Sequence, residues 1–207
     1  MLAAACLVGS GLAAAGDPLP PGAAPSTPTA HESFTLPGSL APPPPSTVPK
    51  NCLQSGDGYL RARLAGSVDA RINWSNSGLR CQGEVRDTPP GVRLSFQRRG
   101  AKPDLLFVFG LTGVQEGRPA RAVPTNLTII VQGTDHIYGT LGDSRCTVDA
   151  LSQRRIGTGK TYRLEARGFC TQPAHAVRGD GAVLVSTFEF AGVVSYEGAA
   201  EVNAPNP

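Results

Sequence analysis

The residues of this sequence with the most scope for chemistry are its five cysteines, because a thiol can form a disulfide, bind a metal or act as a nucleophile. Cys6 lies in an apolar N-terminal stretch, and the other four are Cys52, Cys81, Cys146 and Cys170. Four cysteines allow three pairings. We favour a bridge between the first two of the four and another between the last two, because each then joins neighbouring β segments. No two of them have the spacing of roughly two to four residues that structural zinc favours, so we expect no metal site.

The motifs that suggest catalysis or cofactor binding are incomplete. Residues 157–161 imitate the end of a phosphate-binding P-loop, but Arg154 stands where that motif requires glycine. His136 and His175 are the imidazoles of the folded region, and no Gly-x-Ser-x-Gly turn accompanies them there. Scattered carboxylates such as Asp143 leave a glycosidase-type pair as the remaining enzymatic route. We therefore expect no cofactor and a protein that is not an enzyme, with a secreted hydrolase of envelope or polysaccharide material as the alternative.

The clearest local pattern is a hairpin over residues 60–74. Apolar residues alternate with polar ones on both sides of a turn at residues 65–67. A register with Leu64 opposite Val68 puts the apolar residues on one face. The same register makes Arg63 face Asp69, so the apolar alternation and the opposite charges favour the same pairing of the two strands.

Two places on this scaffold are candidate binding surfaces. The hairpin register sets Arg61 opposite Arg71, a like-charge pair that can hold an anion, meet an acidic partner or turn into water. The second place is a turn with alternating charges next to Cys146, in which Asp143 and Arg145 are the candidate binding residues. Loops and faces displayed on a rigid β scaffold are common binding sites.

The remaining strands are expected at regular intervals, separated by Gly- and Pro-containing turns. The predicted runs are 79–85, 92–97, 105–111, 126–132, 136–140, 145–148, 162–170 and 183–196. Residues 105–109 are apolar at every position, so this run is expected in the centre of a sheet. Only residues 148–156 look briefly helical. The pattern predicts an all-β fold, an antiparallel β-sandwich or jelly-roll-like domain stapled by disulfides.

The N-terminal part of the chain predicts export. Residues 1–15 are apolar or small and end in three alanines, as a cleavable signal segment does, and are too short for a membrane span of about 20 residues. Lipidation of Cys6, which would anchor the protein to a membrane, is the alternative. Proline-rich residues 16–50 are expected to be a disordered tether, 51–198 the β-sandwich domain and 199–207 a disordered tail.

Charge and composition limit the partners. The net charge is +3, with 16 acidic residues among 19 basic ones, so we expect no nucleic-acid partner. With export and disulfides, the expected compartment is the periplasm or the outside of the cell. The expected role is a non-catalytic binding or structural module of the cell envelope, with an envelope protein or polymer of unknown identity as partner.

Three short stretches, residues 123–126, 145–149 and 167–170, resemble those of small uncharacterised secreted proteins of GC-rich proteobacteria. The resemblance covers the chain from Cys52 to Glu197. It implies export and carries no activity.

Overall fold

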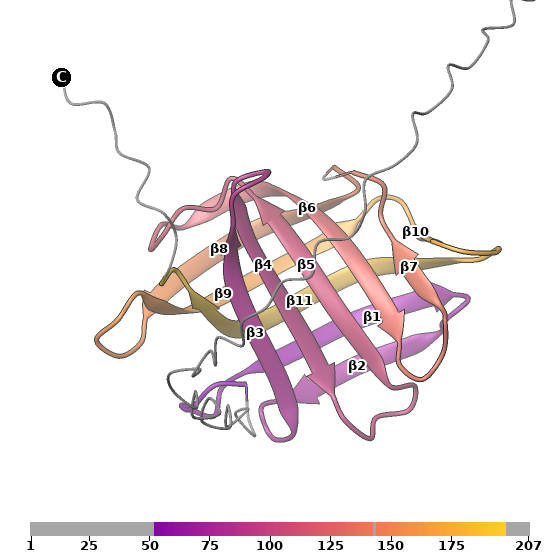
Figure 1. The fold of residues 1–207 in the computed structure, drawn as a ribbon, viewed down its shortest axis with the longest axis horizontal. Helices are drawn as coiled ribbons and strands as arrows, with labels where there is room; N and C mark the ends of the chain where they lie inside the picture. The colour runs from indigo at the N-terminus through magenta and orange to yellow at the C-terminus, as the bar shows by residue number, and fades with distance from the viewer. Residues whose placement is uncertain (1–51, 143, 198–207) are drawn as a thin grey trace, which may run out of the picture. The chain divides into compact units, whose positions relative to one another are not determined.

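The computed structural model describes residues 52–142 and 144–197. The described residues are all-β, as predicted, and contain eleven strands and no helix (Figure 1). Within them, no helix long and apolar enough to cross a membrane is present. The predicted signal segment with Cys6, the predicted tether and tail, and Asp143 lie outside the described residues.

The strands follow one another along the chain with short connections. In order they are β1 Tyr59–Gly66, β2 Ala70–Ser75, β3 Leu79–Arg86, β4 Gly91–Arg98, β5 Leu105–Thr112, β6 Ala120–Val131, β7 Ile137–Gly139, β8 Cys146–Arg155, β9 Thr161–Cys170, β10 Ala174–Ala176 and β11 Ala182–Ser195.

The strands form two layers that belong to one continuous sheet. Figure 1 shows β3, β4, β5 and β6 side by side, with β2, β1, β11, β9 and β8 crossing behind them. The long strand β6 leaves the first layer to pair with β8, and β11 meets β3 in a single parallel bridge at Ser195 and Glu84. All other pairings are antiparallel. Because the β6–β8 and β11–β3 pairings connect the two layers, the sheet closes around the space between them.

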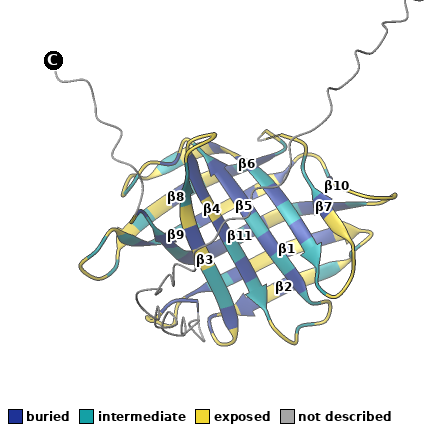
Figure 2. Cartoon of the chain, viewed as in Figure 1, coloured by how far each residue is buried: buried dark blue, intermediate teal, exposed yellow. Residues whose placement is uncertain are grey.

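Aromatic side chains fill the space between the layers. Phe96, Phe107, Phe109 and Phe190 are fully buried, and the rings of Phe109 and Phe190 lie 4.8 Å apart between centroids. Burial of such a side chain stabilises the fold by about 1.5 to 3 kcal/mol. Strand β5 lies between β4 and β6, so its predicted central position is confirmed. Figure 2 shows buried and exposed residues alternating along the strands.

The predicted hairpin exists, but its predicted register is wrong by two residues. Leu64 lies opposite Ala70, which pairs Arg63 with Arg71 and Arg61 with Asn73. The turn is longer than predicted because it is fastened to β11. The amide of Ser67 donates to the carbonyl of Ala182 at 2.9 Å, and Gly66, with φ of 115°, lies so close that a Cβ would meet this carbonyl at 2.4 Å. A shift of two residues leaves each side chain on its predicted face.

The predicted helical turn at residues 148–156 is also wrong, because residues 148–155 are in β8. A β-bulge at Asp149 inserts one residue between Val148, opposite Gly168, and Ala150, opposite Arg167. The bulge places the buried Val148 and Leu151 three residues apart, which imitates helical spacing. Strand β6 begins six residues earlier than predicted, and β10 was not predicted.

Both predicted disulfides are confirmed. Cys52 is bonded to Cys81 of β3, and Cys146 to Cys170, which lies directly opposite it on β9. Disulfides of this kind persist in oxidising, extracytoplasmic compartments, so the structure fits a protein outside the cytoplasm.

Candidate functional site

The segment before β1 is fastened to the sheet by one buried side chain. Asn76 accepts hydrogen bonds from the amides of Leu53 at 2.8 Å and Gly58 at 3.2 Å, and its Nδ2 donates to the carbonyl of Leu53 at 2.9 Å. Asn76 is 6 % exposed, so water does not replace these contacts. Together with the bridge from Cys52, this amide fixes the start of β1.

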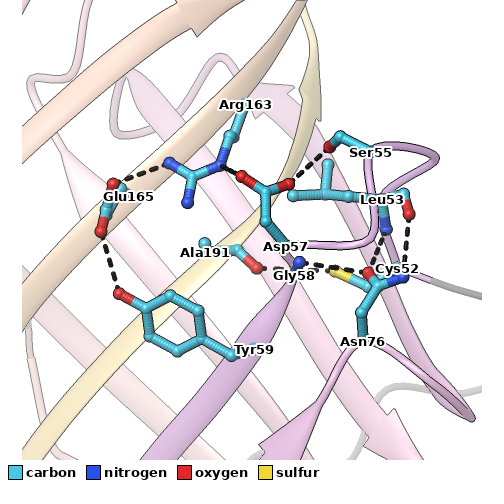
Figure 3. A network of polar contacts seen from close by, with 10 residues as sticks. All are labelled: Cys52, Leu53, Ser55, Asp57, Gly58, Tyr59, Asn76, Arg163, Glu165 and Ala191. Carbon is cyan, nitrogen blue, oxygen red and sulfur yellow. Dashed lines mark hydrogen bonds and ion pairs between the residues drawn. The ribbon is translucent and has the colours of Figure 1, made fainter.

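A chain of charged groups continues from this segment across the outer face (Figure 3). The guanidinium of Arg163, 13 % exposed, lies 2.7 Å from Asp57 and 2.7 Å from Glu165. The contact of its Nε with Asp57 is ionic and not a well-aligned hydrogen bond. Tyr59 donates from its hydroxyl to Glu165 at 3.0 Å. The hydrogen bond from Arg163 is the main reason why the pKa of Glu165 is lowered, against the effect of burial.

Next to this chain, polar side chains form two rows across the strands of the second layer. Strand register brings Asn73, Arg61, Glu189 and Arg167 into one row. A second row contains Arg71, Arg63 and Thr187. Residues between the rows, such as Phe188, point into the core, so both rows face solvent.

The two rows border a depression of about 520 Å³, which we call the arginine depression. Its charged lining residues are Arg61, Arg63, Arg71, Arg167, Asp149 and Glu189. Four guanidinium groups against two carboxylates give it an excess of positive charge. Its volume lies in the range of roughly 300 to 1,000 Å³ of small-molecule sites.

The arginines of the depression differ in their partners. Arg61 binds Glu189 at 2.7 Å and lies over the ring of Tyr59, 4.8 Å from its centroid. The hydrogen bond to Glu189 is the main cause that raises the pKa of Arg61. The side chains of Arg63, Arg71 and Arg167 have no hydrogen bond or ion pair within the described part of the chain. Three guanidinium groups are therefore available to a ligand.

The structure brings together some of the sequence-predicted surface residues and separates others. Arg61 and Arg71 both line the arginine depression, although they are not directly opposite. Arg145 lies elsewhere, where its Nε donates to the carbonyl of Leu141 at 3.2 Å. Asp143 is not among the described residues.

Two arginines of the depression were missed by sequence reasoning. Arg63 was assigned to a pair with Asp69, and the correct register places it opposite Arg71 instead. Arg167 lies on β9, and its outward phase is visible in the alternation of residues 162–170. No sequence signal indicates that it neighbours Glu189 of β11.

Comparison with known proteins adds no relative. No protein family model, curated protein or solved structure matches this chain.

Other hollows and groups offer less chemistry. A larger hollow of about 680 Å³ borders β3, β4, β5 and the end of β11, and its charged lining residues are one arginine, Arg80, and three carboxylates, Glu84, Asp87 and Glu197. His136 and His175 lie at exposed positions of the β7 and β10 region. Across residues 52–142 and 144–197, no three His, Cys, Asp or Glu side chains are grouped as metal ligands.

Proposed function

We propose that this protein is an exported, non-catalytic module of the periplasm or cell envelope that binds its partner through the arginine depression. The observation that carries the proposal is a group of three guanidiniums, those of Arg63, Arg71 and Arg167, which lie in one hollow of a disulfide-bonded sheet and have no partner among the described residues. Guanidinium groups form strong, directional hydrogen bonds with anionic partners. A rigid sheet holds them in place before the partner arrives, which lowers the entropic cost of binding.

The carboxylates near the depression favour binding over hydrolysis. Glu165 and Glu189 both lie on this face, and each contacts an arginine at 2.7 Å. A general acid needs a raised pKa, whereas that of Glu165 is lowered. A hydrolase is therefore the weaker reading of this face.

The proposal is tested by photo-cross-linking in the native cell envelope. A photo-reactive amino acid replaces Asn73 at the edge of the depression or, as control, Gln82 on the outer face of β3. We expect a cross-linked envelope component from position 73 and none from position 82. Equal cross-linking from both positions, or cross-linking from position 82 alone, would contradict the proposed surface.

The proposed export is tested by the intact mass of the protein isolated from that envelope. A chain that begins at Gly16 agrees with cleavage of a signal segment. A chain that begins at Cys6 and carries acyl groups would show that the protein is lipid-anchored. Residues 16–50 would then be the spacer between the membrane and the β domain. A full-length chain would contradict both.

A further inference from the structure

We infer that the arginine depression binds a carboxylate-bearing sugar unit of an acidic polysaccharide. The inference rests on the proposed function and adds the chemical class of the ligand. It follows from the cross-strand geometry of the arginines, from the acceptors placed among them and from the aromatic content of the lining.

The geometry of the arginines favours an anion. Arg63 lies directly opposite Arg71 on β1 and β2, and like charges in such pairs repel. A carboxylate between these two guanidiniums removes the repulsion and accepts paired hydrogen bonds from a guanidinium fork. Arg167 approaches the same hollow from β9, so a bound anion is contacted from both sides of β11.

The acceptors in the lining favour a hydroxylated ligand over a dense polyanion. Asp149 and Glu189 lie among the arginines, with Asn73 and Thr187 beside them. Sugar hydroxyls donate to carboxylates and accept from amides, whereas the sugar-phosphate backbone of DNA has no hydroxyl along its length that could donate to Asp149 or Glu189. A uronic acid presents one carboxylate among several hydroxyls, which matches a lining that combines guanidiniums with carboxylate, amide and hydroxyl groups.

The lining also lacks what single-stranded nucleic acids use most. Bases stack on exposed aromatic rings, and the aromatic residue recorded in the lining, Phe188, is 3 % exposed. A neighbouring hollow of about 300 Å³ shares Arg167 and Glu189 with the depression. The two hollows together extend along the sheet, so that the next unit of a polymer continues into the second.

The test is isothermal titration calorimetry of the full mature chain with tetragalacturonate. The matched control ligand is its methyl ester, which keeps the hydroxyls and loses the charge. Arg71→Gln and Arg167→Gln each remove one unpaired guanidinium of the depression. Arg154→Gln removes one exposed charge of β8 outside the depression and serves as the matched variant. Thermal melts verify that all three variants fold.

We expect binding of the acid and none of the ester. Arg71→Gln and Arg167→Gln should each weaken binding about tenfold, as loss of a charged hydrogen bond does, with Arg154→Gln close to the parent chain. Equal binding of the ester, an equal loss in all three variants, or tighter binding of an octathymidylate would overturn the inference.

The two proposals fail in different ways. If tetragalacturonate does not bind while position 73 still cross-links to an envelope component, the ligand class is wrong and the binding surface stands. If tetragalacturonate does not bind and position 73 does not cross-link to an envelope component, the proposed function is wrong as well.

Discussion

At the scale of single residues, the partner of each outer-face arginine decides what it can do. Arg163 is almost enclosed and bound by Asp57 and Glu165, so its role is to join the first segment to β9. Arg61 shares an exposed ion pair with Glu189, which solvent screens, so the pair contributes little to the stability of the fold. The side chains of Arg63, Arg71 and Arg167 have no ion pair within the described part of the chain, so they are available for binding.

Tyr59 makes the stability of the folded protein depend on pH in the alkaline range. Burial first, and then the hydrogen bond to Glu165, raises the pKa of Tyr59 to about 12. The folded protein therefore holds this proton more tightly than the unfolded chain. This contribution to stability is complete below the ordinary value near 10 and is lost as the pH rises to about 12.

Tyr59→Phe should therefore remove a phenolate step near pH 12 from the ultraviolet absorbance titration and flatten the stability curve above pH 10. Glu165→Gln should lower that step without returning it to 10, because burial remains. A Tyr59 step at the ordinary tyrosine value would contradict both the burial of Tyr59 and its contact with Glu165.

Asn76 holds the segment before β1 in place through its hydrogen bonds to Leu53 and Gly58. Asn76→Ala leaves the buried amides of Leu53 and Gly58 without their acceptor, and the carbonyl of Leu53 keeps only the hydrogen bond from the amide of Gly56. The free energy of unfolding should fall by about 2 to 3 kcal/mol, measured by urea denaturation. Asn73→Ala, at an exposed position of β2, should change it by less than about 0.5 kcal/mol. Similar values for the two variants would contradict the buried role of Asn76.

At the scale of elements, β8 and β9 approach each other closely beside the bulge at Asp149. Gly168 of β9 lies opposite Val148, and a Cβ there would be 2.1 Å from the carbonyl of Thr147 and 2.8 Å from the ring of Phe188. The first of these is backbone, so it cannot turn away. Gly168 therefore allows the close pairing that brings Arg167 beside the depression.

Gly168→Ala should lower the free energy of unfolding by about 2 to 3 kcal/mol, because the two strands must separate locally. Gly139→Ala is the matched control, since a Cβ on Gly139 of β7 meets nothing within 4 Å. Thermal or urea unfolding of both variants makes the comparison. A harmless Gly168→Ala would mean that β8 and β9 are farther apart than described here.

At the scale of the whole molecule, one disulfide connects the segment before β1 to the sheet, and the other joins two neighbouring strands. Cys52–Cys81 spans 29 residues and fastens the first segment to β3, and Cys146–Cys170 spans 24 and links β8 to β9. Such bridges restrict the unfolded chain, which stabilises the folded one.

Replacement of either cysteine pair by serine should lower the free energy of unfolding by about 3 to 4 kcal/mol, and full reduction should lower Tm markedly. Intact mass should increase by two hydrogens for each bridge that is reduced. Denaturation of the parent and the two double variants measures the effect. An unchanged melting curve after verified reduction would refute the structural role of the bridges.

The residues alone assign the faces of the strands and the all-β class, and they favour one of three possible disulfide pairings, which the structure then establishes. The alternation of residues 60–64 assigns inside and outside locally, and a register shift of two leaves that assignment intact. The central place of β5 follows from its apolar residues in the same way.

Only the tertiary structure decided which outer residues become neighbours. The contact of Ser67 with Ala182 sets the hairpin register, and the bulge at Asp149 converts an apparent helical spacing into a strand. The meeting of Arg61, Glu189 and Arg167 depends on pairing among β1, β11 and β9. Alternation states which way a side chain points but carries no information about the strand beside it, because that strand comes from a distant part of the chain.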